Sequence, residues 1–272
     1  MKANHVNQYP ILETQATEII RAELAALLKP YWHKIVIVGG SVPAILVQGQ
    51  PKHLGTLDID LLFDLQQFQI GEFSLMIRRL RSAGYTKSRD EKTPFRLVKT
   101  IGEITIPVDF LVPIPPLHPI ITTLLDHEEM QLSAAPGLNI AFHQPIQIEI
   151  EGHQINIASL PALLATKGYS ISDNRRKDAY DIWYILSHPS DAPMQLGIAC
   201  RSYLEIPDAK TGYQRLAGFF RADDDLGPQW VASFLQSDDL APEQIMQDAY
   251  QRVQIWAETL GLSVSLLMDA PQ

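Results

Sequence analysis

Two short motifs near the start of the chain constrain its fold more than any other feature. One apolar run ends in Gly39-Gly40-Ser41, and a later apolar run carries Asp58 and Asp60. Side chains two residues apart on a strand project to the same face, so these two carboxylates are expected to lie together. Like charges at such a place repel unless a cation lies between them, and Mg²⁺ prefers oxygen ligands. The second motif therefore predicts a metal site.

The glycine pair predicts where an anion would bind. Gly39 and Gly40 follow a buried strand and precede a helix expected at residues 41–48, with Ser41 as its N-cap. Backbone N–H groups at the start of a helix attract anions such as phosphate. A phosphate-binding turn next to metal-binding carboxylates indicates an enzyme that handles nucleotides.

The composition is that of a packed globular protein from a reducing compartment. Of the 272 residues, 46% are apolar and 19% are charged, which excludes wholesale disorder. The single cysteine, Cys200, excludes an intrachain disulfide and argues against a zinc–cysteine cluster. The first residues lack the apolar core of a signal peptide, and no apolar run reaches membrane-spanning length. We therefore expect a cytoplasmic protein with no membrane partner.

Charge is unevenly distributed along the sequence. The net charge of −9 argues against a nucleic-acid partner, but the segment 78–99 is strongly basic. Its basic residues are Arg78, Arg79, Arg81, Lys87, Arg89, Lys92, Arg96 and Lys99. Such a segment is either an ordinary solvated surface or a face that binds the phosphates of RNA.

Hydrophobic periodicity predicts an α+β fold, in which a mixed β-sheet with flanking helices is followed by a mainly helical C-terminal region. Strands are expected at 34–38, 57–63, 85–89, 95–99 and 103–112, helices at 13–28, 66–83, 120–132, 159–167, 175–187 and 242–260, and a hairpin around Glu151-Gly152. Pro107 predicts that its strand lies at an edge or contains a bulge, because proline cannot donate to a sheet. The Pro-rich segment 113–119 predicts a boundary between a catalytic core, residues 1–117, and a mainly helical domain, residues 118–272.

A third carboxylate, Asp109, lies within a strongly apolar strand. An isolated charge is costly there, so we expect a neighbouring strand to place Asp109 beside Asp58 and Asp60. Three carboxylates can hold two metal ions, of which one activates an attacking hydroxyl and the other steadies a triphosphate. Asp109 would also suit a general base for that hydroxyl.

A second polar group follows in the helical region. Lys167 lies at the end of one expected helix, and Arg175, Lys177, Asp178 and Asp181 lie on the next. Lys177 and Asp181 are four residues apart, so they share one face of that helix. These charges either line a cleft or belong to an ordinary helix surface.

The order of these motifs resembles the DNA polymerase β-type nucleotidyltransferase superfamily, in which a glycine pair with serine precedes a strand with two acids and a third acid on a later strand. From Lys167 to Asp181 the pattern K…R-x-K-D-x-x-D-I resembles AbiEii-type nucleotidyltransferases, the toxins of type IV toxin–antitoxin systems. The resemblance spans roughly residues 35–187. It implies the polymerase β-type fold and a nucleotidyltransferase activity.

The resemblance also implies a role for each residue of the two groups. Gly39, Gly40 and Ser41 would bind the triphosphate, while Asp58, Asp60 and Asp109 would bind two Mg²⁺ ions. Lys167 would act in catalysis by reaching a phosphate of the nucleotide. Arg175, Lys177, Asp178 and Asp181 would complete the nucleotide site, with Asp181 orienting Lys177 or Arg175.

These features predict an enzyme that transfers NMP from an NTP to an acceptor hydroxyl and releases pyrophosphate. The resemblance favours an RNA acceptor such as a tRNA 3′ end, bound through residues 78–99, and a cognate antitoxin protein as a partner. The acidity of the chain instead favours a small cationic acceptor such as an antibiotic. A non-catalytic nucleotide-binding protein of the same fold is a third alternative.

Overall fold

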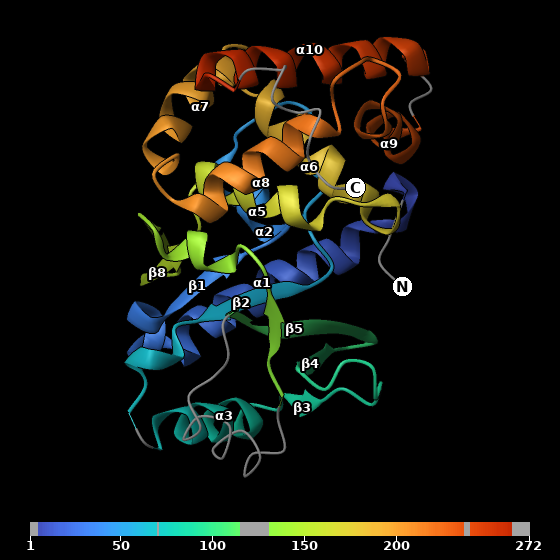
Figure 1. Cartoon of the computed structure of the whole chain (residues 1–272). Coiled ribbons are helices and arrows are strands. Elements are labelled where there is room, and N and C mark those ends of the chain that lie inside the picture. The colour runs from blue at the N-terminus through green and yellow to red at the C-terminus, as the bar shows by residue number, and fades with distance from the viewer. Residues whose placement is uncertain (1–4, 70, 115–130, 237–239, 263–272) are drawn as a thin grey trace. The chain divides into compact units, whose positions relative to one another are not determined.

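The structure is a computed structural model that describes residues 5–69, 71–114, 131–236 and 240–262 (Figure 1). Backbone contacts divide the chain into two compact units. The sheet unit comprises Pro10–Ser41 and Thr56–Ala158, and the helical unit comprises Met1–Tyr9, Val42–Gly55 and Ser159–Gln272. The predicted boundary between residues 117 and 118 lies outside the described residues, as does most of the helix expected at 120–132.

The sheet unit is built on a mixed sheet, which has eight strands in the described part of the chain. The strands lie in the order β3-β4-β5-β2-β1-β8-β7, and β6 pairs with β5. The pairs β1–β8, β2–β5 and β5–β6 are parallel, and the other pairs are antiparallel. The strands are β1 Ile35–Val38, β2 Ile59–Phe63, β3 Thr86–Lys87, β4 Arg96–Ile101, β5 Ile104–Pro113, β6 Ser133–Ala135, β7 Ile146–Ile150 and β8 His153–Ile157.

Aromatic packing fixes β2 against β5 at the centre of the sheet. Strand β1 is buried along its whole length, and only Asp60 interrupts the burial of β2, as expected for strands covered on both faces. Phe63 of β2 stacks on Phe110 of β5 with ring centroids 5.0 Å apart, and meets Phe73 edge-on at 6.0 Å. Each such pair contributes about 1 kcal/mol beyond its buried area. The register of β2 on β5 is therefore held by the core.

Helices α1 (Ile11–Leu27) and α3 (Glu72–Ser82) flank this sheet. Helix α1 packs against β5 and β8, and α3 reaches β2 through Phe73. The expected helix at 66–83 is wrong at its start. Gly71 has a φ of +85°, which interrupts a helix, and the residues after Asp64 form only a 3₁₀ turn, Leu65–Gln67.

Pro107 does not place its strand at the edge of the sheet. Strand β5 is an interior strand, because β4 pairs with it on one side and β2 on the other. The pairing with β2 begins only at Val108, opposite Ile59, so Pro107 itself lies opposite β4 alone. The missing N–H of the proline thus falls outside the doubly paired part of β5.

The helical unit contains a short helix α2 (Ser41–Leu46, of which Val42 onward belongs to this unit) and six longer helices among its described residues (Figure 1, yellow to red). These are α5 Leu160–Ser170, α6 Arg176–Ser187, α7 Ala192–Cys200, α8 Pro207–Gly218, α9 Leu226–Leu235 and α10 Pro242–Leu260. Ser159 caps α5 by accepting a hydrogen bond from the backbone N–H of Ala162, as predicted. Helix α10 packs against α7 and α9.

The predicted fold class is confirmed, because a mixed sheet with flanking helices is followed by helices as far as residue 260. None of the helices described here is long and apolar enough to cross a membrane.

Close backbone packing between α5 and α8 generates a first prediction. A Cβ added at Gly212 would collide with the backbone of Ala165, whereas one added at Gly218, on the same helix, would meet nothing. Gly212→Ala is expected to lower the free energy of unfolding of the helical unit by about 1–3 kcal/mol through overpacking. Urea unfolding followed by circular dichroism measures the decrease. Gly218→Ala is the matched control, and equal midpoints for the two variants would contradict the close approach of the two helices.

Candidate functional site

Three carboxylates converge at the centre of the sheet unit. Asp60 of β2 lies directly opposite Asp109 of the parallel strand β5, and Asp58 lies just before β2. One oxygen from each carboxylate lies within 4.8 Å of the others. Asp109 is buried, while Asp58 and Asp60 are partly exposed. Three hard oxygen donors at this spacing fit a divalent cation such as Mg²⁺, and we refer to them as the acidic triad.

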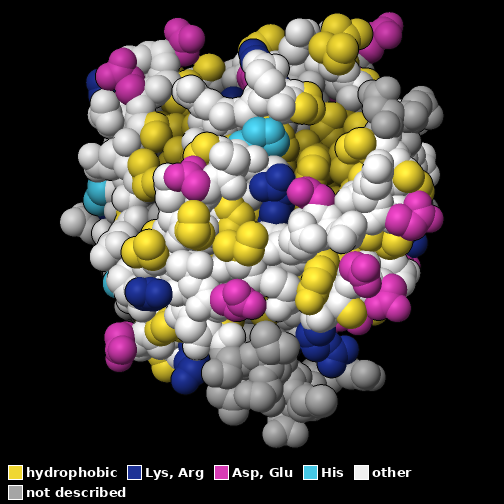
Figure 2. Space-filling model, turned by 90° about the horizontal axis from the view of Figure 1, so that it is seen from above, with side chains coloured by type: hydrophobic (Ala, Val, Ile, Leu, Met, Phe, Trp, Pro, Cys, Tyr) yellow, Lys and Arg dark blue, Asp and Glu magenta, His cyan; other side chains and the backbone are white. Residues whose placement is uncertain are grey.

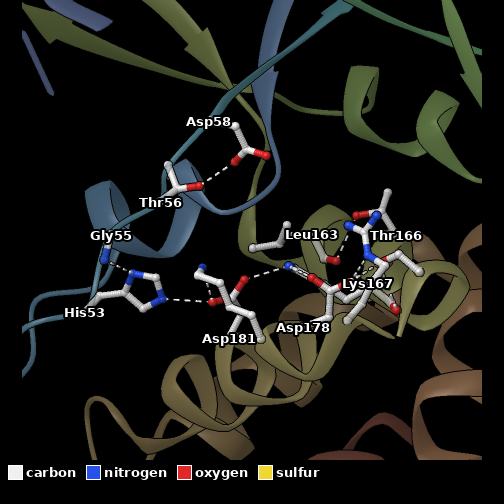
Figure 3. Close-up of polar contacts among 12 residues, drawn as sticks. His53, Gly55, Thr56, Asp58, Leu163, Thr166, Lys167, Asp178 and Asp181 are labelled. Carbon is white, nitrogen blue, oxygen red and sulfur yellow. Dashed lines mark hydrogen bonds and ion pairs between the residues drawn. The ribbon is translucent and has the colours of Figure 1, made fainter. Parts of the chain in front are cut away.

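Two neighbours from the sheet unit position the acidic triad. The hydroxyl of Thr56 donates to Oδ1 of Asp58 at 2.7 Å (Figure 3). Gly39 follows Val38, which pairs with Asp60, and a Cβ added at Gly39 would collide with the Asp60 carboxylate. Gly39 also has a φ of +70°, a backbone conformation that side chains disfavour. The glycine is thus required both for its backbone conformation and for the space that it leaves.

Asp109 forms a two-pronged ion pair with Arg96 of β4. Nε of Arg96 donates to Oδ1 at 2.6 Å and Nη2 donates to Oδ2 at 2.8 Å. The two residues lie opposite each other in the antiparallel pair β4–β5. The hydrogen bonds to Asp109 raise the pKa of Arg96, and the charges of Asp58 and Asp60 add to this effect. The guanidinium is therefore a counter-charge for the whole acidic triad.

The predicted phosphate-binding turn lies between β1 and α2. Ser41 is buried, and its hydroxyl has no hydrogen-bond partner among the described residues. Helix α2 has only six residues, so its dipole is small and any anion would rely on local N–H and O–H groups. Gly40 lies in this turn between Gly39 and Ser41.

The second predicted group forms a buried ion network in the helical unit, which we call the lysine network. The ammonium of Lys167 on α5 bonds to Asp178 and, at 2.6 Å, to Asp181, both on α6. Arg175 and Ser170 each donate to Oδ2 of Asp178 at 2.7 Å. Lys177 donates to Oδ1 of Asp181 at 2.8 Å, as their four-residue spacing predicts.

His53 joins the lysine network from the loop after α2. Its Nε2 lies 3.0 Å from Oδ1 of Asp181, and its Nδ1 accepts the backbone N–H of Gly55 at 3.1 Å (Figure 3). Because Nδ1 accepts, the proton of the neutral ring lies on Nε2, which donates to Asp181. The ring packs against Tyr180 and Tyr184 at centroid distances of 5.3 and 4.9 Å. His53 therefore fixes the orientation of Asp181.

Burial and charge pairing set the protonation states in the lysine network. Burial alone would lower the pKa of Lys167, but Asp178 and Asp181 outweigh it and raise this pKa. Burial would likewise raise the pKa of Asp181, but Lys167 and Lys177 hold it well below its usual range. Burial lowers the pKa of His53 to about 4, so the ring is neutral at pH 7. Lys167 and Asp181 are therefore both charged at pH 7, next to a neutral histidine.

The structure brings together the residues of each predicted group within a single unit. Asp58, Asp60 and Asp109 meet in the sheet unit, while Lys167, Asp178 and Asp181 meet in the helical unit with their cationic neighbours. Four further side chains take part without a predicted role in these groups, namely Thr56, Arg96, His53 and Ser170. Only Thr56 carries a signal in the sequence, because it precedes the two acids in T-x-D-I-D.

The basic segment 78–99 divides into paired and exposed residues. Arg96 is paired with Asp109, and Lys99 is paired with Glu23. The side chains that are exposed at the surface of the sheet unit include Arg78, Lys87, Arg89 and Lys92. Figure 2, a view from the α10 side of Figure 1 that labels none of these residues, shows basic and acidic side chains interspersed on that face. The segment thus offers fewer cations to a polyanion than its sequence indicates.

Comparison with known proteins gives one family match. The model described as "Nucleotidyl transferase AbiEii toxin, Type IV TA system" matches residues 56–252, which is more than half of the chain. No curated protein matches the sequence significantly.

Two solved structures are similar in backbone. One, described as a candidate nucleotidyltransferase from H. pylori, has 11% identity and a TM-score of 0.43, over 93% of this chain and 97% of that chain. The other, an antigenic nucleotidyltransferase-like protein from Paracoccidioides brasiliensis, has 15% identity and a TM-score of 0.35, over 72% of this chain and 90% of that chain.

The depressed pKa of His53 predicts a pH-dependent stability. Histidine has an ordinary pKa of 6.5, whereas the pKa of His53 in the folded protein is about 4. Between these two pH values the unfolded chain binds a proton on His53 that the folded lysine network excludes. The contribution of His53 to the free energy of unfolding is therefore fully present above pH 6.5. It decreases by up to about 3 kcal/mol as the pH drops towards 4. Urea unfolding at pH 7.5, 6 and 5 measures the slope.

Two variants isolate the contribution of His53. His53→Gln is expected to flatten the slope between pH 6.5 and 4, whereas His33→Gln, at an exposed position, leaves it unchanged. A wild-type slope in His53→Gln would show that other groups cause the pH dependence.

Proposed function

Because the chain belongs to the AbiEii family of nucleotidyl transferase toxins of type IV toxin–antitoxin systems, we propose that it transfers NMP from an NTP to an acceptor hydroxyl. The observation that carries this proposal is the acidic triad, whose oxygens lie within 4.8 Å of one another. Pyrophosphate is the leaving group. The enzyme would act in the cytoplasm as the toxin of a pair, held in check by a cognate antitoxin protein.

The acidic triad would hold the metal. Asp58, Asp60 and Asp109 supply only carboxylate oxygens, the donor set that Mg²⁺ takes when it also binds phosphates. Mg²⁺ bound there would offset the charge of the triphosphate and favour ionisation of the acceptor hydroxyl. Both oxygens of Asp109 already accept a hydrogen bond from Arg96, so we give Asp109 the role of a ligand rather than that of the base.

The chain's own groups would position the nucleotide. Gly39, Gly40 and the unpartnered hydroxyl of Ser41 would bind oxygens of the triphosphate. In the reaction, the acceptor oxygen bonds to the α-phosphorus and the bond from that phosphorus to the β-phosphate oxygen breaks. Pyrophosphate leaves with the electron pair, and the hydroxyl proton passes to solvent or a carboxylate. Such a displacement depends mainly on positioning and charge neutralisation.

We give the lysine network the role of a phosphate-binding group in the helical unit. Its cations are Lys167, Arg175 and Lys177, and the last two are the more exposed. Asp178 and Asp181 would hold these side chains in fixed orientations, because each carboxylate bonds to two of the three cations. Preorganised cations of this kind stabilise charge that develops on transferring phosphoryl groups.

Substitution within the acidic triad tests the activity. Asp58→Asn is expected to reduce pyrophosphate release from NTP by about 10³-fold or more, because it removes a charged metal ligand. Growth arrest on expression should disappear with it. Asp64→Asn, which changes a carboxylate just beyond β2, is the matched control and should keep both. Full activity in Asp58→Asn would refute the site, and nucleotide binding without turnover in the wild type would favour a non-catalytic protein.

The acceptor is proposed to be RNA, bound through the exposed cations Arg78, Lys87, Arg89 and Lys92. Arg89→Gln with Lys92→Gln should weaken RNA binding and reduce the slope of log affinity against log salt by about one for each phosphate that is no longer neutralised. Lys210→Gln, at an exposed position on α8, is the control. Turnover that is independent of salt and of these residues would favour a small cationic acceptor, in keeping with the net charge of −9.

A further inference from the structure

Arg96 lies where a cation is least expected in a metal site. Its guanidinium bonds to both oxygens of Asp109, at 2.6 and 2.8 Å, and Asp109 is one of the three proposed metal ligands. The Asp109 side chain is 7% exposed and that of Arg96 is 23% exposed. The ion pair is therefore shielded from water and is stronger than a surface pair.

The register of the sheet builds this ion pair into the fold. Arg96 of β4 lies opposite Asp109 of β5, and Asp109 lies opposite Asp60 of β2. Directly opposite residues project to the same face of a sheet, so a cation and two acids form one row across three strands. Asp58 lies close to both acids of this row. Because the pairing of β4 with β5 fixes the backbone of Arg96, the guanidinium can move away from Asp109 only by a rotation of the Arg96 side chain.

The ion pair has a direct consequence for metal binding. A carboxylate oxygen has two lone-pair positions, and Arg96 takes one on each oxygen of Asp109. Asp109 can then offer a metal one further position per oxygen, and a divalent cation there also meets the repulsion of a positive charge. An anionic triphosphate in the site offsets this repulsion, because it adds negative charge beside both the divalent cation and Arg96.

We propose that Arg96 is a positioning residue that couples metal binding to nucleotide binding. In the empty site, Arg96 neutralises Asp109. Its positive charge also weakens the binding of a divalent cation that arrives without a nucleotide. When the triphosphate binds, its negative charge offsets the charge of Arg96. This inference rests on the proposed function only in taking the acidic triad as the metal site. The metal would thus bind chiefly together with its nucleotide.

Binding of Mn²⁺ tests the coupling without any turnover. Free Mn²⁺ is measured by electron paramagnetic resonance during titration of the full chain, first alone and then with a non-hydrolysable NTP analogue. Arg96→Gln is expected to bind Mn²⁺ alone at least about tenfold more tightly than the wild type, since it removes a nearby positive charge. The gain in Mn²⁺ affinity on adding the analogue should be large in the wild type and small in Arg96→Gln.

Matched variants separate charge from structure. Arg96→Lys keeps the charge and should therefore keep the weak Mn²⁺ binding and the coupling. If Arg96→Gln does not fold, the Mn²⁺ binding of Arg96→Lys remains as the test of the charge. Lys99→Gln removes a cation from the same strand that is paired with Glu23, and should behave as the wild type. Asp58→Asn should abolish Mn²⁺ binding in every background.

The outcomes distinguish the inference from the proposed function. Equal Mn²⁺ affinity in the wild type and Arg96→Gln, with no binding in Asp58→Asn, would overturn the coupling and leave the metal site intact. Mn²⁺ binding that Asp58→Asn does not affect would overturn the metal site itself. Coupling that is equally strong in Arg96→Gln and the wild type would also overturn the role of Arg96.

Discussion

Repulsion among three carboxylates is the constraint on which the sheet unit depends. Asp58, Asp60 and Asp109 lie within a few ångströms of one another, and Asp109 is buried. Such a group is costly unless cations balance it. The fold supplies one cation permanently, since the register of β4 on β5 places Arg96 opposite Asp109. A second source of positive charge, a metal ion, completes the balance in the function that we propose.

The helical unit also contains buried acids, and here cationic side chains of the same unit balance their charge. Lys167 and Asp181 are almost fully buried, and every acid of the lysine network bonds to at least two cations. Breaking one partner of a buried pair leaves an uncompensated charge, at a cost of about 3–5 kcal/mol. The neutral His53 completes the bonding of Asp181 without adding charge. Buried networks of this kind hold their members in one arrangement, which suits groups that must meet an anion in a fixed geometry.

Much of the fold follows from periodicity in the sequence, and the errors of prediction have identifiable causes. The apolar strand β1, the strand β2 that carries Asp60, and the long amphipathic helix α10 (Pro242–Leu260) match their predicted positions closely. Residues 66–69 do not form part of α3, because Gly71 takes a positive φ and the helix begins after it. The interior position of the strand with Pro107 depends on where β2 begins to pair with it, and no local pattern reports that.

The candidate site likewise contains residues that a sequence motif predicts and residues that no motif predicts. A motif marks the acidic triad, the glycine pair, Lys167 and the acids of α6, because each depends on spacing along one strand, turn or helix. Arg96 and His53 have no such signal. Arg96 lies thirteen positions before Asp109, and His53 lies far from Asp181 in the sequence. Their roles are a product of strand register and of the packing of a loop on a helix.

The sequence by itself determined which chemical groups this protein has and the local elements that carry them. It determined the fold class, the three carboxylates, the glycine turn and the resemblance to a nucleotidyltransferase family. Only the tertiary structure decided which charges neutralise one another: it took Arg96 and Lys99 out of an expected basic surface and paired them with acids. The physical reason is that a side chain's charge is fixed by its residue type, whereas its partner is fixed by contacts between residues that are distant in the chain.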